Sequence, residues 1–360
     1  MFRLGLENAK EHLPKGKMGL ITNLGSVTGE LELNIDYLIR EGFNLGRIFT
    51  PEHGLYGTEA NGAEVSDNTF RGIQATSLYG AKMKPDRADL EGLDYLVYEI
   101  QDAGVRFYTF ISTLYNMVEA SKESNIPLYV LDRPNPLNTV DIQGPVLKDE
   151  FRSFVGTDAL PSRYGLTIGE LALFFNRKFK ADVHVVKMSG YSRKYYFDDI
   201  YRWFIPPSLN LPDIDSVITY SGLCLLEATE LSMGRGTPYP FHFFGKPDLP
   251  ELELGQEGIK LRRTKYRPTL DPYKDQLIDG YFLHILDRSK YDPFKLALSV
   301  IIELFEKGSL KIDRPKLARL YGSDDLYRML ESGTTVKEVM DSWKNDQDEF
   351  RKKSQEFHLY

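Results

Sequence analysis

The sequence has 360 residues, of which 42% are hydrophobic and 27% are charged, and its formal net charge is −7. These are ordinary values for a globular protein, and the length is sufficient for two domains. The negative charge argues against a nucleic-acid surface, which usually has a basic excess. A single cysteine, Cys224, excludes a disulfide framework and a multi-cysteine zinc site, and its apolar neighbours predict a buried, inert thiol.

The first residues, MFRLGLENAKEHLPKGK, contain neither the apolar stretch nor the cleavage site of a signal peptide. No window approaches 18 uninterrupted apolar residues, so we expect no membrane span. These features predict a cytoplasmic protein, although a secreted form that has lost its leader is also compatible with them.

The first half of the chain alternates between apolar, β-rich runs and helical patterns. Strands are predicted at residues 18–22, 45–49, 73–80, 94–100, 127–132 and 183–188. Helices are predicted at 31–43, 85–92 and 109–124, and after the capping-box pattern formed by Thr167 and Glu170. This alternation indicates an α/β fold with a mostly parallel sheet covered on both faces.

The regular alternation of strand and helix patterns ends at the proline-rich run IPPSLNLPD, at residues 205–213. A helical stretch at 221–232, a Gly-Arg-Gly turn and a charged, linker-like segment at 253–268 follow it. A strand is then predicted at 281–287, an amphipathic helix at 292–307 and a helical tail from residue 317 onward. We therefore predict two α/β domains, residues 1–205 and 206–360.

Polar side chains follow nearly every predicted strand of the first domain, whereas commonplace residues precede the strands. The residues at these exits are Asn23, Glu52, His53, Tyr79, Gln101, Asp102, Arg106, Tyr108, Asp132 and Arg133. Ligands of open parallel sheets bind beyond the carboxyl ends of the strands. The asymmetry predicts a functional site at this edge of the sheet.

Glu52 and His53, in the stretch TPEHGLYG, allow three interpretations. They could form a polar turn, a metal-ligand pair or a catalytic acid with a neighbouring imidazole. The metal interpretation is weak because adjacent residues seldom bind one ion, and no other histidine shows HxxxH or HxH spacing. The long irregular stretch predicted at 54–72 favours a functional loop.

A glutamic acid at the mouth of an apolar cleft can act as a proton donor, because burial favours the neutral form of a carboxyl group. Glycoside hydrolysis needs such an acid and a second group, which assists water or acts as the nucleophile. The candidates for the second group are Asp102, Glu99, Asp132, Glu227 and Glu230. Asp102 is favoured because it follows the end of its strand, although a capping role is an equal alternative.

Four arginines recur in the predicted loops: Arg106, Arg133, Arg163 and Arg235. Each could be an ordinary surface or ion-paired residue, and Arg133 could pair with Asp132. As a set beside acidic residues, they suggest recognition of an anionic group on the ligand, since a guanidinium binds a carboxylate in a planar fork. The sequence lacks GxGxxG, GK[ST] and GxSxG motifs, so neither a phosphate loop nor a serine hydrolase is supported.

A series of short motifs occurs in an order typical of one bacterial family. They are GLITN, FTPEHGLYG, SLYG, YEIQDAGVRFYTF, VLDRPNPL, QGPV, SFVG, TIGEL, PPSLNLP, GRGTPYPF and the closing LYGSDDLYRMLESGTTVKEVMDSW. From about residue 4 to 360, the chain resembles the exo-β-N-acetylmuramidase family (NamZ-like), long known only as a domain of unknown function. The resemblance implies a Rossmann-like catalytic domain, a smaller auxiliary domain and an active-site cleft between them.

The resemblance also implies an activity and site residues. The activity is exo-acting release of β-linked N-acetylmuramic acid from the non-reducing ends of peptidoglycan fragments or muramyl disaccharides, without metal or other cofactor. The glutamate of the PEHG motif, the favoured catalytic acid, falls on Glu52. The QD-G-RFYT block falls on Gln101, Asp102, Arg106 and Tyr108, and the RPNP block falls on Arg133 and Asn135. The lactyl carboxylate of N-acetylmuramic acid is an anionic group of the kind that the four arginines are expected to bind.

Three positions depart from the family pattern. Tyr164 stands where the family has a histidine, Met233 where it has a glutamate, and Glu99 where it has an aspartate. The first two bear on recognition of the aglycone or a peptide and leave Glu52 and Asp102 in place. Two alternatives therefore accompany the glycosidase prediction: a muropeptide-binding protein without catalysis, and a metal-dependent hydrolase that uses Glu52, His53 and Asp102.

Overall fold

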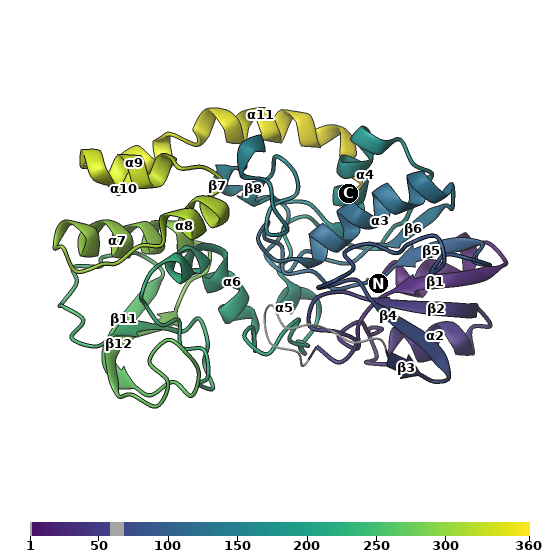
Figure 1. Ribbon diagram of the computed structural model, residues 1–360, viewed down its shortest axis with the longest axis horizontal. Coiled ribbons are helices and arrows are strands. Elements are labelled where there is room, and N and C mark those ends of the chain that lie inside the picture. Colours follow the sequence, from purple (N-terminus) through teal and green to yellow (C-terminus); the bar gives the residue numbers. More distant parts are fainter. Residues whose placement is uncertain (1, 58–67) are drawn as a thin grey trace. The chain divides into compact units, whose positions relative to one another are not determined.

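The computed structural model of the protein describes residues 2–57 and 68–360 (Figure 1). The chain forms two compact units: unit 1 comprises Met1–Asp141, Gly165–Leu209 and Lys352–Tyr360, and unit 2 comprises Ile142–Tyr164 and Asn210–Arg351. The chain passes from one unit to the other after residues 141, 164, 209 and 351, whereas the sequence predicted one boundary near residue 205.

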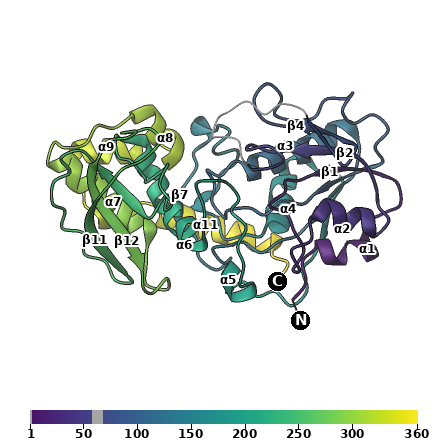
Figure 2. The ribbon, with the colours of Figure 1, turned by 90° about the horizontal axis from the view of Figure 1, so that it is seen from below.

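Unit 1 is built on a seven-stranded sheet with the order β3-β4-β2-β1-β5-β6-β9, and Figures 1 and 2 show several of these strands side by side. The strands are β1 (Lys17–Ile21), β2 (Asn44–Thr50), β3 (Asn68–Phe70), β4 (Ile73–Ser77), β5 (Tyr95–Tyr98), β6 (Leu128–Leu131) and β9 (Val183–Val186). All neighbours pair in parallel except β3, which pairs antiparallel with β4 at one edge. The six parallel strands follow the Rossmann order 3-2-1-4-5-6 when numbered along the chain. The predicted α/β fold is confirmed.

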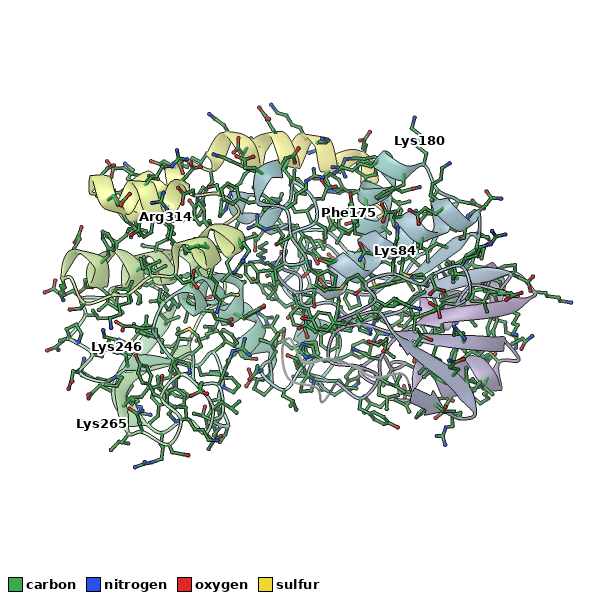
Figure 3. The ribbon with its side chains drawn as sticks, viewed as in Figure 1. Lys84, Phe175, Lys180, Lys246, Lys265 and Arg314 are labelled. Atoms are coloured by element: carbon green, nitrogen blue, oxygen red, sulfur yellow. The ribbon has the colours of Figure 1, made fainter. Side chains whose placement is uncertain are left out.

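Most of the longer connections of unit 1 contain helices. These are α1 (Ala9–His12), α2 (Asn34–Arg40), α3 (Phe110–Ser124), α4 (Ile168–Phe179) and α5 (Phe197–Ile200), with short three-ten helices η1 (Leu6–Asn8) and η4 (Gln355–Phe357). The predicted capping box is confirmed at the start of α4, where the Thr167 side chain accepts from the Glu170 amide and the Glu170 side chain accepts from the Thr167 amide. Helices α3 and α4 pack together, with the Tyr115 ring 5.1 Å from that of Phe175, which is labelled in Figure 3.

The central strands are apolar throughout because both faces of the sheet are covered. All four residues of β5 are buried, and so is Leu20 in the adjacent strand. This continuous burial explains why the sequence shows apolar runs here rather than alternation. It also leaves the loops at the strand ends as the place for polar chemistry.

Unit 2 contains a three-stranded antiparallel sheet, a two-stranded ladder and a set of helices. The sheet has the order β10 (Phe243–Lys246), β12 (Ile278–Ile285), β11 (Ile259–Tyr266). The ladder pairs β7 (Gln143–Val146) with β8 (Pro161–Arg163). The helices are α6 (Ile214–Leu223), α7 (Pro293–Glu306), α8 (Arg314–Tyr321), α9 (Asp325–Ser332), α10 (Val336–Asp341) and α11 (Lys344–Ser354), with three-ten helices η2 (Asp149–Phe151) and η3 (Cys224–Ala228). The last three residues of α11 belong to unit 1. Cys224 is buried as predicted, and burial raises the pKa of its thiol.

Two predicted elements differ in the structure. Residues 85–92 form turns rather than a helix: the Asp86 amide donates to the Asp89 carboxylate, and the Asp89 amide donates to the Asp86 carboxylate, both at 3.0 Å. Such side-chain bonds compete with helical ones. The charged segment predicted as a linker contains β11, which pairs with β12 along its whole length.

The predicted long loop at 54–72 is described only in part. Residues 58–67 lie outside the described residues, and the remainder includes the whole of β3. Among the residues that the structure describes, no helix combines the length and apolar character needed to cross a membrane.

Candidate functional site

The loops that follow the parallel strands of unit 1 meet at one edge of the sheet, here called the carboxyl edge. The Leu24 amide, after β1, donates to the Leu55 carbonyl, after β2, at 2.7 Å. The Gln101 side-chain amide, after β5, donates to the Pro134 carbonyl, after β6, at 2.9 Å. Strands β1 and β5 are neighbours at the point where the strand order reverses, and that point is where Rossmann-type sheets bind their ligands.

Glu52 lies at the carboxyl edge in a tight turn of residues 51–54, closed by a 3.0 Å bond from the Gly54 amide to the Pro51 carbonyl. Its side chain is buried and accepts a hydrogen bond from the Thr109 hydroxyl. Tyr79, after β4, also donates its phenol to Glu52. Burial and the nearby Glu52 carboxylate raise the pKa of Tyr79 to about 12, so the phenol remains a proton-bearing donor. Hydroxyl groups from two other loops thus hold this carboxyl group.

His53 adopts a left-handed backbone conformation, with φ at 72°. For a residue other than glycine, such a conformation costs on the order of 1–3 kcal/mol and persists where the surroundings enforce it, often at functional sites. The imidazole is buried, with its centroid 6.4 Å from the Tyr108 ring and 6.3 Å from the Phe110 ring. The turn and these rings give the imidazole a defined position next to Glu52.

Asp102 lies in the loop after β5, where its Oδ2 accepts a 2.7 Å bond from the Gly104 amide. Gly104 has a φ of 80°, and a Cβ atom at this position would overlap the Asn135 side chain. Asn135 in turn donates to the Leu166 carbonyl at 2.9 Å and accepts from the Leu137 amide at 2.9 Å. The loop that carries Asp102 is therefore packed directly against a rigid asparagine.

Glu99 and Arg133 form a buried ion pair at the same edge. Arg133 also donates to the Gln101 side chain at 3.2 Å and to the Val27 carbonyl at 3.0 Å. These contacts join the loops after β1, β5 and β6, so Arg133 braces the carboxyl edge from below the surface. Its predicted role in ligand binding stays a prediction.

Asp132, the residue before Arg133, is completely buried. It accepts hydrogen bonds from the Arg133 amide, the Gly169 amide, the Thr167 hydroxyl and the Tyr360 hydroxyl, at 2.7–3.0 Å. Burial raises the pKa of Asp132 to about 7, against the opposing effect of these donors. The carboxylate ties the end of β6 to the start of α4.

The other predicted residues of this edge are also buried. Arg106 is fully enclosed, and Tyr108 packs its ring edge against Phe110 at 4.7 Å. The Asn23 side chain accepts from the Gly25 amide at 3.1 Å, which shapes the turn after β1. Thr109 was not among the predicted site residues, although it stands directly after Tyr108 in the RFYT motif.

The remaining predicted arginines and glutamates belong to unit 2. Arg163 ends β8 and donates to the Gln143 side chain at 3.2 Å. Arg235 pairs with Glu227 at 2.5 Å. Glu230 pairs at 2.5 Å with Lys246, which is labelled in Figure 3. Both glutamates proposed as alternative second carboxylates are thus ion-paired within unit 2.

Two of the three departures from the family motifs, Tyr164 and Met233, also lie in unit 2. Both side chains are buried, with 1% and 2% of their surface exposed. Neither side chain is therefore exposed to solvent.

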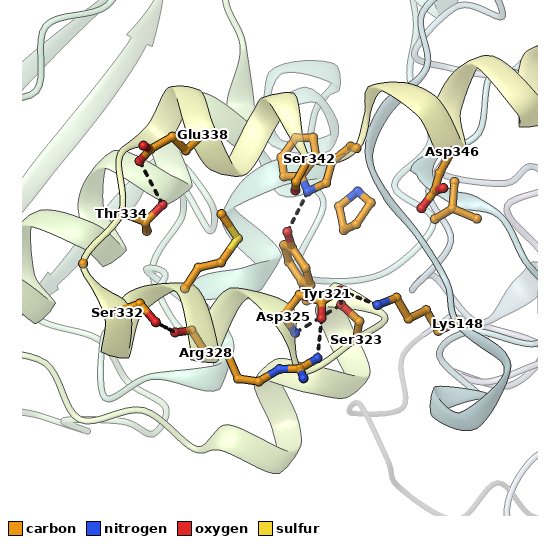
Figure 4. Close-up of a pocket in the computed structure, with 15 residues that line it drawn as sticks. Lys148, Tyr321, Ser323, Asp325, Arg328, Ser332, Thr334, Glu338, Ser342 and Asp346 are labelled. Carbon is orange, nitrogen blue, oxygen red and sulfur yellow. Dashed lines mark hydrogen bonds and ion pairs between the residues drawn. The ribbon is translucent and has the colours of Figure 1, made fainter.

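A separate cavity of about 730 Å³ opens in unit 2 beside α8–α11 (Figure 4). Its charged lining is largely paired internally: Asp325 binds both Lys148 and Arg328 at 2.5 Å. The Trp343 indole donates to the Tyr321 hydroxyl at 2.6 Å. Among the described residues, none of those predicted for the site lines this cavity. Within residues 2–57 and 68–360, no group of three or more His, Cys, Asp and Glu side chains is placed to hold a metal ion.

The strand order and the acidic residues at the carboxyl edge define a Rossmann-type α/β protein whose switch point carries buried carboxyl groups. Residues 18–215 match the family model described as exo-β-N-acetylmuramidase NamZ, N-terminal, and residues 218–360 match the corresponding C-terminal model. The chain therefore belongs to the NamZ exo-β-N-acetylmuramidase family.

Individual relatives support this assignment over the whole chain. The chain is 36% identical to the peptidoglycan β-N-acetylmuramidase NamZ of Bacillus subtilis (strain 168), over 99% of this chain and 89% of that protein. Two crystal structures of DUF1343 family proteins from Bacteroides fragilis NCTC 9343 match 100% of the chain and 99% of their own. Their TM-scores are 0.89 and 0.82, at 32% and 27% identity.

Proposed function

We propose that this protein is an exo-acting glycoside hydrolase that releases β-linked N-acetylmuramic acid from the non-reducing ends of peptidoglycan fragments. Family membership and the Bacillus subtilis relative, named as a peptidoglycan β-N-acetylmuramidase, support the reaction class. The observation that carries the proposal is the setting of Glu52, a buried carboxyl group held by the hydroxyls of Thr109 and Tyr79.

Those hydroxyl partners suit a group that must both hold and release a proton. A hydroxyl donates to a carboxylate, and it can rotate to accept from a protonated carboxyl group. Both protonation states of Glu52 can therefore keep a hydrogen bond. In the proposed reaction, Glu52 donates its proton to the glycosidic oxygen as the bond from the anomeric carbon to that oxygen breaks.

Asp102 is the proposed second carboxylate. Its bond from the Gly104 amide and the packing of Gly104 against Asn135 fix its position. At the anomeric carbon it either attacks directly or takes a proton from the incoming water, and in both cases water supplies the new hydroxyl of the released sugar. Glu99, Asp132, Glu227 and Glu230 are each bound by structural partners in their own units.

The proposed substrate-binding residues are those predicted from the sequence. In unit 1 they are Asn23, His53, Gln101, Arg106, Tyr108, Arg133 and Asn135, and in unit 2 they are Arg163 and Arg235. The guanidinium of Arg106, four residues after Asp102, is the unit 1 candidate for binding the lactyl carboxylate of N-acetylmuramic acid. Arg133 contributes indirectly, through its bond to Gln101.

Two isomeric disaccharides test the proposal. The protein should hydrolyse MurNAc-GlcNAc and leave GlcNAc-MurNAc intact, because only the first has N-acetylmuramic acid at its non-reducing end. Products can be separated by chromatography and identified by mass. Cleavage of both disaccharides, or of neither, would contradict the proposed activity.

A further inference from the structure

Residues 357–360 pack into unit 1 close to the end of β6. The Phe357 ring lies 5.6 Å from Phe174 on α4, and the Leu359 amide donates to the Glu170 carboxylate at 2.9 Å. The Tyr360 ring makes an edge contact with Tyr191 at 5.0 Å. This segment therefore has a defined seat on α4 and on the loop after β9.

The hydroxyl of Tyr360 makes two hydrogen bonds within that seat. It donates to Asp132 Oδ2 at 2.7 Å and accepts from the Met188 amide at 2.8 Å. The accepted bond orients the hydroxyl so that its proton is directed to Asp132. This contact spans 228 positions in the sequence, and no local motif predicts it.

Asp132 connects this hydroxyl to the carboxyl edge. It accepts from the amide of Arg133, the first residue of the 133–135 loop. Within that loop, the Arg133 side chain holds Glu99 and Gln101, and Asn135 lies against Gly104. A shift of the Asp132 carboxylate would be passed through the 133–135 loop to the loop that carries Asp102.

From this chain of contacts we propose that Tyr360 is a positioning residue for the reaction. Its hydroxyl orients Asp132, and Asp132 holds the 133–135 loop in place. In that position the loop contacts Gln101 and the loop that carries Asp102. The inference rests on the proposed function, because its effect is read from turnover.

Three other ionisable groups lie near residues 357–360. Glu170 pairs with Arg193, and Arg193 lies 3.3 Å from the His358 ring. Burial raises the pKa of Glu170, and burial followed by the nearby Arg193 lowers the pKa of His358. The substitutions below leave these three side chains intact.

The test compares Tyr360→Phe with Tyr191→Phe as a matched control. Both changes remove one partly buried phenol oxygen from the same aromatic cluster, but the Tyr191 hydroxyl faces Thr139, at 3.4 Å. We expect Tyr360→Phe to lower kcat on MurNAc-GlcNAc roughly three- to tenfold with KM within about twofold, the loss expected for one hydrogen bond. Tyr191→Phe should leave kcat unchanged. Equal kcat values for Tyr360→Phe and the wild type would overturn the inference.

A double-mutant cycle with Asp132→Asn separates positioning from general loss of packing. If Tyr360 acts through Asp132, Tyr360→Phe should have little further effect on kcat in the Asp132→Asn background. A full, additive loss in that background would overturn the inference even if Tyr360→Phe also lowers the melting temperature. A wild-type protein that cleaves neither disaccharide would instead contradict the proposed function, so the two failures are distinguishable.

Discussion

Glu52 and Glu99 are both buried carboxyl groups just beyond strand ends at the carboxyl edge of unit 1, yet their observed hydrogen-bond donors differ in kind. The Arg133 guanidinium binds Glu99, and the Asn34 amide adds a second donor. Hydroxyl groups of Thr109 and Tyr79 approach Glu52. Burial alone therefore does not identify a catalytic acid at this edge.

The difference lies in what each set of partners permits. A guanidinium has five donors and no acceptor, so it supports only the ionised carboxylate. A hydroxyl can donate or accept, so it supports both the ionised and the protonated forms. The comparison supports the proposal that Glu52 transfers the proton, whereas the contacts of Glu99 join loops.

The largest expected effect is on activity, from Glu52→Gln. The amide keeps the size of the side chain and its hydrogen bonds to Thr109 and Tyr79 but cannot donate a proton as an acid. We expect turnover of MurNAc-GlcNAc to fall by roughly 10²- to 10⁴-fold, the usual contribution of a general acid. Substrate binding, measured by calorimetry, should persist. Unchanged turnover would remove Glu52 from the mechanism.

Glu99→Gln should act on stability instead. The substitution leaves the buried Arg133 without its counter-charge, and breaking such a pair by removing one partner costs about 3–5 kcal/mol. Denaturant unfolding of the variant, beside the Glu52→Gln protein as a control, measures the loss. A Glu99→Gln protein as stable as Glu52→Gln would show that the pair does not brace the edge.

The pH dependence of stability provides a third test, through Asp132. Because burial raises its pKa from the ordinary value of about 4 to about 7, the folded protein binds the Asp132 proton more tightly than the unfolded chain. The stabilisation is complete below about pH 4 and is lost as pH rises through about 7. The free energy of unfolding should thus fall across this window by a few kcal/mol more in the wild type than in Asp132→Asn. Parallel pH profiles for the two proteins would contradict the buried-acid account.

A smaller effect on activity is expected from Tyr79→Phe. It removes one hydroxyl donor to Glu52 and keeps the ring, so kcat/KM should fall about tenfold, consistent with one hydrogen bond to a charged group. The melting temperature should change little. If Tyr79→Phe matched the loss of Glu52→Gln, the phenol would have to take part in proton transfer itself.

The sequence predicted much of this fold because its signals are local. Apolar runs marked the parallel strands, and the Thr167 and Glu170 pattern marked the start of α4. Local patterns failed where tertiary pairing decides the structure. Strand β11 carries charges on a largely exposed face and is specified by its pairing with β12.

The candidate site shows the same division. Strand exits in the sequence predicted which residues gather at the carboxyl edge, because parallel strands end on one side. The partners within the edge could not be predicted. Glu99 and Arg133 are 34 positions apart, and Thr109 is 57 positions from Glu52, so only the folded sheet brings them together.

The most direct test of the central claim is the dependence of the Glu52→Gln defect on the leaving group. The dinitrophenolate of a dinitrophenyl β-N-acetylmuramide leaves the anomeric carbon without being protonated, whereas the GlcNAc leaving group of MurNAc-GlcNAc needs a proton from the enzyme. If Glu52 is the acid, Glu52→Gln should lose most of its turnover on the disaccharide and little of the bond-cleavage rate on the dinitrophenyl substrate. Equal losses on both substrates would contradict the assignment of Glu52 as the proton donor.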